Sequence, residues 1–430
     1  MQENPEPRRR LALPPALRHR TFRLYFSGLV FSSFGNSFIQ LAIIWQLYEL
    51  TGSPLQIGLL GLSRASATIP VLLLGGLLAD AVNRRRLIIF AHTGHFIVAG
   101  TLVTLSFTDA LEPGMFYVAA MLGGLFMALA NPARQAMVPN MVPATDLTNA
   151  LALTATQRSV ARIAGPPVAG ILLGFVGPTA TYAVATASWL MMLTVMFLIR
   201  SVPQAPVRRR GVSFRALNDG LSYVWAHPIL LSMMLLDFGQ NFLGAARGLL
   251  PVYAADIFEV GPQGFGILSA ASAIGTLVGG VLMSSIPQVR RAGIGVLIGI
   301  SIFGICTVLF AYNTVFWIAL VLLGGEGFGD TVSHVFRGTI LQLNTPDHLR
   351  GRVTSLNMVF TNGGGPLGQF RAGGMAEWLG PQIAVLSGGV AVLGVVGLFA
   401  VWIPMVRRYV LEPGSTRVPE ATPADPIDTA

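Results

Sequence analysis

The sequence predicts an all-α membrane protein in which twelve transmembrane helices form two six-helix bundles. Three observations predict it: an apolar composition, recurring apolar runs of about 20 residues, and arginines confined to alternate connections. With 53% hydrophobic residues, 11% charged residues and a mean hydropathy of +0.65, the 430-residue chain has too few polar side chains to cover a water-soluble globule. Lipid must therefore be its main solvent.

Apolar runs define the expected spans and the domain plan. The first six cover residues 22–48, 54–80, 87–107, 115–137, 148–175 and 179–200. The second six cover residues 229–255, 264–286, 292–312, 315–337, 352–379 and 381–406. The plan is a tail at 1–21, a bundle at 22–200, a linker at 201–228, a bundle at 229–408 and a tail at 409–430.

The two polar ends and the linker have distinct expectations. Residues 1–21 are basic, without the apolar stretch and cleavage site of a signal peptide. In the linker, apolar residues recur at helical spacing between Phe214 and Trp225, which predicts an amphipathic helix lying on the membrane surface. The proline-rich C-terminal tail is expected to be disordered.

Arginine placement predicts the orientation, because basic residues are retained in cytoplasmic loops. Arginines cluster in the N-terminal tail, at residues 84–86, 208–210, 290–291 and 350–352, and near the C-terminus. The opposite connections contain no arginine and hold the acids Glu49, Asp109, Glu112, Asp256 and Glu259. We therefore expect a multi-pass protein of the bacterial inner membrane with both termini and the linker in the cytoplasm.

Several classes of chemistry lack support in the sequence. The single cysteine, Cys306, excludes an intrachain disulfide and a Cys-based metal site. No nucleophile motif or phosphate-binding glycine loop is present. His92 and His95 share a helix face but have no third ligand, so packing is favoured over metal binding. We expect no enzyme activity, no cofactor, no metal and no nucleic-acid partner; the expected partners are membrane lipids, protons and a small-molecule substrate.

An internal repeat relates the two halves. Three features recur 200 or 203 residues later: Arg134 as Arg337, Pro143 as Pro346, and Gly165–Pro166 as Gly365–Pro366. The two bundles are therefore expected to share one plan, as a parallel repeat.

The connection between the second and third spans runs from Gly76 to Arg86 and reads GLLADAVNRRR. It resembles the loop signature of the major facilitator superfamily, with Ala81 at a usually basic position and Asn83 at a usual glycine. Asparagine tolerates the left-handed conformation that such a turn requires. The resemblance implies a conformational latch, formed by Gly76, Asp80, Arg84 and Arg85, that closes the cytoplasmic side.

The fifth span carries Ala152, Ala161, Gly165, Pro166, Ala169 and Gly170. This pattern, with Arg162, is similar to the superfamily's glycine-rich antiporter signature, although close helix packing explains small residues equally well. Residues 131–135, 142–143, 161–166 and 350–353 resemble the enterobactin-exporter and macrolide-efflux (transmembrane secretion effector) branch. The resemblance implies the major facilitator fold, with spans 1, 4, 7 and 10 lining a central cavity.

Polar side chains on these spans are candidate substrate contacts. They are Asn36, Gln40, Met127, Asn131, Asp237, Gln240 and Asn241. Hydrogen bonding between helices is the alternative role for each.

Arginines within the spans also need an explanation, because charge in lipid is costly. Arg158 and Arg162 lie one turn apart and could recognise an anionic substrate or form structural ion pairs. Three further arginines, Arg64, Arg247 and Arg371, are expected near the outer helix ends. There they could pair with outer acids and gate that side, or extend to lipid headgroups.

The tenth span carries Glu326, Asp330, His334 and Arg337 at spacings that place them on one helix face. Two acids one turn apart in a low-dielectric setting cannot both ionise cheaply, so one is expected to hold a proton near neutrality. We interpret Glu326 and Asp330 as proton-coupling groups, with Asp237 as the alternate carrier. A static network neutralised by Arg337 and His334 is the other interpretation.

Together these patterns predict a secondary transporter, working by alternating access and most consistent with proton-coupled efflux of a drug-like or siderophore-like small molecule. The alternatives are an uptake permease of the same fold and a non-transporting membrane receptor or scaffold.

Overall fold

The structure is a computed structural model that describes residues 14–81, 83–199, 214–244, 246–286 and 291–410. In the first half the helices are α1 (Pro15–Arg18), α2 (Arg20–Thr51), α3 (Pro54–Ala81), α4 (Arg84–Phe107), α5 (Pro113–Met137) and α6 (Leu147–Leu198). In the second half they are α7 (Phe214–Ala226), α8 (Pro228–Leu243), α9 (Leu250–Val252), α10 (Gly261–Ser285), α11 (Ala292–Ala311), α12 (Phe316–Leu343), α13 (Asp347–Leu379), α14 (Pro381–Trp402) and α15 (Pro404–Arg408). Short turns connect some of them: η1 (Val138–Asn140), η2 (Ala144–Asp146), η3 (Ala246–Leu249) and η4 (Tyr253–Ile257).

The helices account for the predicted spans. Within the described residues, 8 helical segments are long and apolar enough to cross a membrane. One of them, α6, contains two spans, because Gly177 takes a φ of 79° and breaks the helix. Another runs from Pro228 to Ile257 and is interrupted after Leu243. Together with α3, α12 and α13, these segments match the twelve predicted spans.

Glycine and proline set the helix boundaries. Gly52 ends α2 with a left-handed φ of 59°, and Pro54 starts α3 two residues later. Pro113 and Pro381 likewise begin α5 and α14, where the missing N–H costs no helical hydrogen bond. This local chemistry explains why the observed helix ends lie within a few residues of the predicted ends.

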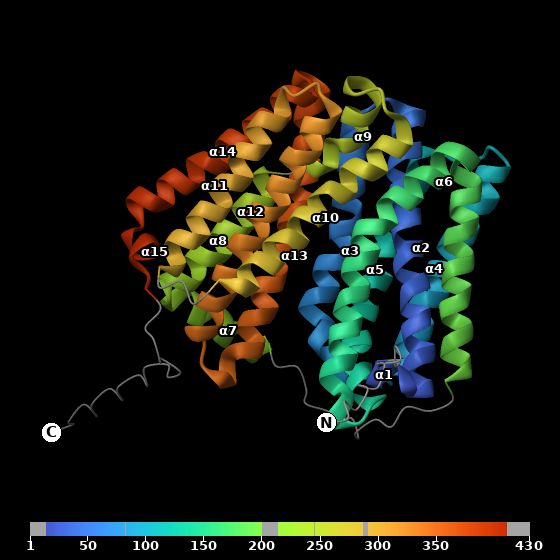
Figure 1. The fold of residues 1–430 in the computed structure, drawn as a ribbon, viewed down its shortest axis with the longest axis horizontal. Coiled ribbons are helices and arrows are strands. Elements are labelled where there is room, and N and C mark those ends of the chain that lie inside the picture. The colour runs from blue at the N-terminus through green and yellow to red at the C-terminus, as the bar shows by residue number, and fades with distance from the viewer. Residues whose placement is uncertain (1–13, 82, 200–213, 245, 287–290, 411–430) are drawn as a thin grey trace, which may run out of the picture.

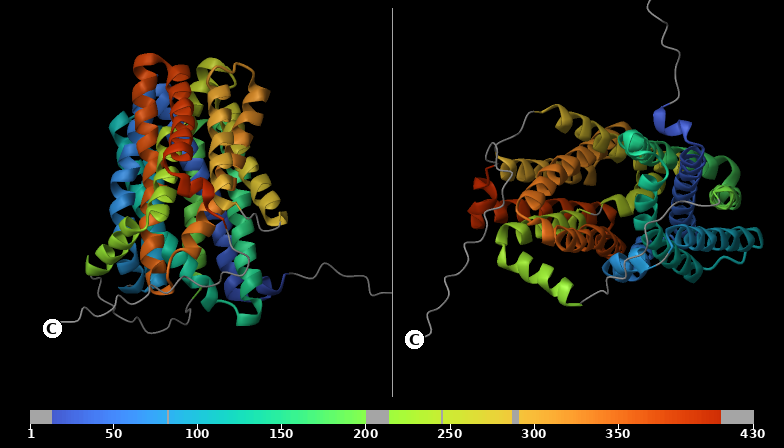
Figure 2. Two further views of the ribbon diagram at one scale, coloured as in Figure 1. Left: turned by 90° about the vertical axis from the view of Figure 1, so that its left-hand side faces the viewer. Right: turned by 90° about the horizontal axis from the view of Figure 1, so that it is seen from below.

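The two halves lie side by side, with α2 to α6 on the right of Figure 1, α8 and α11 to α14 on the left, and α9 and α10 in the upper middle between them. The views in Figure 2 show the same two groups of helices from the side and from below. The halves meet in the upper part of Figure 1 and diverge toward the lower end, where α1 and α7 lie. The short helix α15 lies on the left of that view and packs into the same second-half core as α7 and α8. We call the upper end the closed end and the lower end the open end.

Core packing follows this division. One buried cluster combines residues of both halves at the closed end, including Trp45, Trp189 and Phe310. Toward the open end the cores are separate: one contains only first-half residues such as Phe22 and Met137, and the other only second-half residues such as Met233 and Ile340. The halves are therefore joined at one end and independent at the other.

Small residues allow the helices to meet at the closed end. A Cβ atom added to Gly170 on α6 would collide with the backbone of Pro262 on α10, and one added to Gly266 would collide with Pro166. Gly373 on α13 faces the backbone of Pro54 and Gly58 on α3 with equally little space. The two pairs α6–α10 and α3–α13 thus pack backbone against backbone.

The linker interval contains the helix α7, where Val224 is buried and Trp225 is exposed, as expected for an amphipathic helix. The expected disorder of the C-terminal tail concerns residues 411–430, which lie outside the described residues, as do residues 1–13 and 200–213.

Candidate functional site

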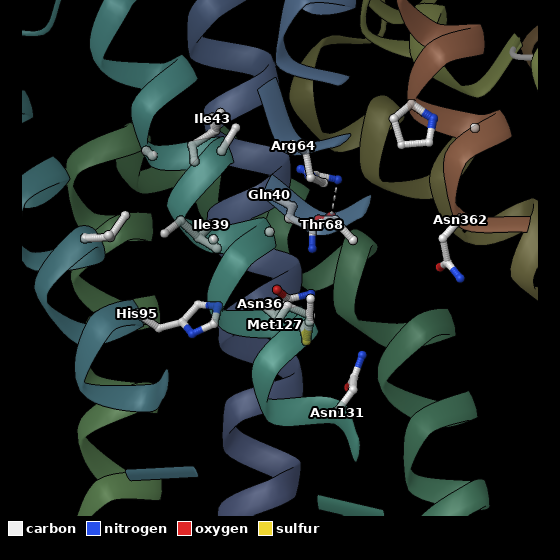
Figure 3. A pocket seen from close by; sticks show the side chains of 18 of the residues that line it. Asn36, Ile39, Gln40, Ile43, Arg64, Thr68, His95, Met127, Asn131 and Asn362 are labelled. Carbon is white, nitrogen blue, oxygen red and sulfur yellow. Dashed lines mark hydrogen bonds between the residues drawn. The ribbon is translucent and has the colours of Figure 1, made fainter. Parts of the chain in front are cut away.

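A cavity of about 370 Å³ lies between α2, α3, α4, α5 and α13. The predicted contacts Asn36, Gln40, Met127 and Asn131 line it (Figure 3). The same four residues also line an adjoining cavity of about 490 Å³, which is bounded by α2, α5, α6 and α10. The structure therefore brings these four candidates together around one continuous space.

The sequence suggested that Arg64 lies near an outer helix end. In the structure it lies inside this region instead. Its Nη1 atom donates a hydrogen bond to Oε1 of Gln40 at 3.3 Å, and both side chains line the smaller cavity (Figure 3). Sequence position alone misplaced it, because Arg64 is about ten residues into α3, roughly 15 Å from the start of that helix.

Three more arginines, Arg134, Arg158 and Arg162, line the larger cavity. Arg158 and Arg162 are exposed to it and make no hydrogen bond or ion pair with a described residue. In the part of the chain that the structure describes, no aspartate or glutamate lines either cavity. The first half therefore presents a cationic, polar surface to this space.

The second half holds a buried polar network between α8, α12 and α13. Nη2 of Arg337 lies 2.8 Å from Oδ1 of Asp237, and both side chains are about 95% buried or more. Thr361 donates a short hydrogen bond to the other Asp237 oxygen, and Asn241 donates to Oδ1 at 3.0 Å. The Asp237 carboxylate thus has a charged partner and two neutral donors, which compensate its burial.

Gln240 extends this network along α12. Its Nε2 atom donates to Asp330 at 2.8 Å, while its Oε1 atom accepts from Ser333 at 3.1 Å and from Arg337 at 3.3 Å. We call the following set the α8–α12 network: Asp237, Gln240, Asn241, Asp330, Ser333, Arg337 and Thr361.

The predicted contacts on the seventh span therefore occupy a different place from those in the first half. Asp237, Gln240 and Asn241 belong to the α8–α12 network and do not line the two cavities. Sequence reasoning missed Ser333 and Thr361, whose hydroxyl groups give no signal of their own in the sequence.

Glu326 is buried on α12, one turn from Asp330, but has different partners. It accepts from Thr307 at 3.4 Å, and its Oε2 atom lies 3.7 Å from Nε of Arg247. Oε2 has no hydrogen-bond partner among the described residues. His334 is exposed and Arg337 pairs with α8, so the four residues of the expected α12 column do not interact as one unit.

The outer acids have partners other than the expected arginines. Tyr48 donates to Asp256, and Ser53 and the Leu55 N–H donate to Glu377, so these bonds join the two halves at the closed end. Arg371 instead donates to the carbonyl groups of Phe242 and Leu243 at the end of α8.

In the predicted latch, Arg84 donates to the Ala136 carbonyl at the end of α5, and Arg85 donates to the Met196 carbonyl at the end of α6. Asn83 does not adopt the expected left-handed conformation: its φ is −59°, and its side chain caps α4 by accepting from the N–H groups of Arg85 and Arg86. The Gly76 and Asp80 positions belong to α3, but the side chain of Asp80 lies outside the described part.

The small-residue pattern of α6 is a packing surface. A Cβ atom added to Gly165 would collide with Ser37 of α2, and Gly170 contacts α10. Arg162 points from the same helix into the larger cavity, and Pro166 lines that cavity too.

His92 and His95 pack on the ring of Trp189, with centroid distances of 5.3 and 4.3 Å.

Comparisons with known proteins agree with this architecture. Residues 12–422 match the family model of the transmembrane secretion effector. The enterobactin exporter EntS of Shigella boydii is 25% identical over 414 residues, covering 95% of this chain and 96% of that protein. EntS of Escherichia coli O1:K1 is 25% identical over 422 residues, with the same coverage.

Solved structures share the fold. The nucleoside transporter NupG superposes with a TM-score of 0.68 at 17% identity, covering 89% of this chain and 99% of that one. A bacterial homologue of the human lysosomal transporter Spinster, in an inward-facing and unoccupied conformation, gives a TM-score of 0.66 at 15% identity, covering 92% and 97%. These relatives are membrane transporters and not enzymes. The chain belongs to the transmembrane secretion effector family of major facilitator superfamily transporters.

Proposed function

We propose that this transporter is a proton-coupled exporter of a small molecule from the cytoplasm, working by alternating access in the inner membrane. The open end, which carries α1, α7 and α15, would face the cytoplasm. Its basic residues, including Arg84 to Arg86 and Arg407 and Arg408, support this orientation through the preference of cytoplasmic loops for arginine. The structure would then represent the inward-facing state.

Alternating access is supported by the way the halves are joined. The shared core and the bonds of Tyr48 and Ser53 to the other half are confined to the closed end. Rocking the halves about the cavities would open that end and close the other. Among the described residues, few hydrogen bonds between the halves need to break, which suits a transition between two states of similar free energy.

The observation that carries proton coupling is Glu326. Its carboxylate is buried, and its nearest cation, Arg247, is 3.7 Å away on η3, at the interruption of the seventh span. An intramembrane acid with a loosely held partner can exchange a proton for an ion pair as helices move. Asp237 is less suited to this role, because Arg337, Thr361 and Asn241 already engage both of its carboxylate oxygens.

Export is supported by the names of the relatives, which are enterobactin exporters. Comparing metabolites in cells with and without the gene identifies the substrate, with enterobactin as the first candidate. Deletion of an exporter raises the internal concentration of its substrate, whereas deletion of an uptake permease lowers it.

Coupling is tested in proteoliposomes that contain the purified protein and the identified substrate. The Glu326→Gln variant is expected to lose accumulation driven by a pH gradient while it retains downhill exchange. Glu112→Gln, an exposed acid at the closed end, is the matched control and should behave as wild type. If Glu326→Gln and Asp330→Asn both accumulate substrate at wild-type rates, α12 does not carry the proton.

A further inference from the structure

Among the residues that the structure describes, no acid lines the larger cavity to offset its positive charge. Arg134, Arg158 and Arg162 all line it, and the remaining lining side chains are uncharged. A third cavity, of about 200 Å³, adjoins it through Arg134 and Arg158 and also lacks an acid in the described residues. Three cations that share one space repel each other, and the repulsion is relieved by a bound anion.

Arg134 is the most constrained of the three. Its Nε atom is buried without a hydrogen-bond partner in the described part of the chain, and Nη2 lies 3.1 Å from the sulfur of Met127. A thioether is a weak acceptor and carries no charge, so it does not satisfy a guanidinium. The related arginine of the second half, Arg337, has the carboxylate of Asp237 at 2.8 Å. Arg134 therefore lacks the carboxylate partner that Arg337, its counterpart in the internal repeat, possesses.

The facing helix α2 cannot supply that partner. Its only acid is Glu49, near Thr51 at the closed end, whereas Arg134 and Arg158 lie toward the open end beside Ser33. The α2 residues that line the larger cavity beside these arginines are serine, asparagine and glutamine. These side chains can donate hydrogen bonds to an oxyanion but cannot neutralise an arginine.

The cavity also has an apolar part. Leu41, Ile44 and Phe265 line it nearer the closed end, because α2 runs from the open end at Arg20 to the closed end at Thr51. Leu41 and Phe265 belong to the buried core at that end, as does Trp45, which stacks on Phe265. A volume of about 490 Å³ accommodates a drug-sized molecule.

From this arrangement we infer that the larger cavity binds the substrate as an organic anion, with its oxyanion group between Arg158 and Arg162 and its apolar or aromatic part against Phe265. Arg134, which lines the same cavity, adds a third positive charge, and Asn131 and Ser33 add neutral hydrogen-bond donors. Guanidinium groups bind planar oxyanions through paired hydrogen bonds, which ammonium groups cannot reproduce in full. The inference rests on the proposed transport function and names its substrate class.

The test measures equilibrium binding of matched probes to the full-length protein in nanodiscs of neutral phosphatidylcholine. The probes are 2-naphthoate, its neutral amide, and 2-naphthylmethylammonium, which share one ring system. Wild type is expected to bind the carboxylate at least about tenfold more tightly than the amide, with the ammonium probe weakest.

In the variant Arg158→Gln/Arg162→Gln, affinity for 2-naphthoate is expected to fall at least about tenfold, while affinity for the amide is unchanged. The lysine pair, Arg158→Lys/Arg162→Lys, should restore part of the loss. Because neither arginine bonds to a described residue, folding should be preserved. The matched control is Arg407→Gln/Arg408→Gln, which removes the same charge from exposed positions on α15.

Equal affinity for carboxylate and amide in wild type would overturn the inference, as would unchanged carboxylate affinity in the glutamine pair. Native mass spectrometry of the protein in nanodiscs that contain phosphatidylglycerol tests whether the anion bound by these arginines is a lipid headgroup. One outcome is that wild type retains a phosphatidylglycerol molecule, that the glutamine pair loses it, and that this lipid blocks the binding of 2-naphthoate. In that case the arginines hold a lipid headgroup, and the substrate assignment is wrong. Binding needs no pH gradient, so its failure is distinguishable from a failure of coupled transport.

Discussion

Two arginines related by the internal repeat have opposite environments. Arg337 is buried against Asp237 within the α8–α12 network, whereas Arg134 lines a cavity without an acid in the described residues. One repeat thus keeps its charge compensated inside the protein, and the other leaves it available to a ligand. This difference suggests a division of labour, in which the first half recognises substrate and the second half controls protons and stability.

The largest expected effect comes from breaking the compensated pair. Asp237→Asn leaves the Arg337 guanidinium buried without a carboxylate, which should lower the free energy of unfolding by about 3–5 kcal/mol. Thermal unfolding in detergent, followed by tryptophan fluorescence, measures the loss. Arg134→Gln is the counterpart in the first half and should leave stability unchanged or raise it. Equal destabilisation by the two variants would contradict the proposed difference between the compensated Arg337 and the uncompensated Arg134.

The connections of the two halves differ as well. The first-half loop has the acid Asp80 followed by Arg84 and Arg85, whereas the corresponding connection of the second half has Ser284 near the position of the acid. We expect Asp80→Asn to reduce transport turnover by about tenfold or more while membrane insertion stays normal, because partly buried ion pairs contribute more than exposed ones. Ser284→Ala is the control and should transport normally. Wild-type turnover by Asp80→Asn would exclude the latch.

Smaller effects are expected within the cavities. Asn36→Ala and Gln40→Ala should each raise the apparent KM about 2- to 10-fold with unchanged expression, because each removes a single hydrogen bond to substrate. Initial transport rates at varied substrate concentration provide the measurement. The same series with Asp237→Ala and Asn241→Ala asks whether these two residues also touch substrate in another state. Equal apparent affinity in all four variants would count against substrate contact.

The sequence predicted the helices well because their signals are local. Apolar runs of membrane length mark the spans, and Gly52, Pro54 and Gly177 interrupt the chain where a helix must end or break. The amphipathic pattern before Trp225 likewise depends only on neighbouring residues. None of these features requires knowledge of which helices touch.

The site was less predictable because its partners come from distant segments. The spacing of Glu326, Asp330 and Arg337 placed them on one face, but their partners come from α8, α11 and η3. Arg64 was expected at an outer end because the sequence does not show that Gln40 faces it across the cavity. The sequence marked Arg134 through the repeat and the branch resemblance, but the lack of a partner for its Nε atom is visible only in three dimensions.

The most direct test of the division of labour compares two variants in one proteoliposome assay that yields both the apparent KM and the accumulation driven by a pH gradient. The account predicts that Arg158→Gln/Arg162→Gln raises KM and keeps coupled accumulation at saturating substrate. It predicts that Glu326→Gln keeps KM for downhill exchange and loses coupled accumulation. If the arginine pair abolishes coupling and Glu326→Gln changes only KM, the assignment of the two halves is contradicted.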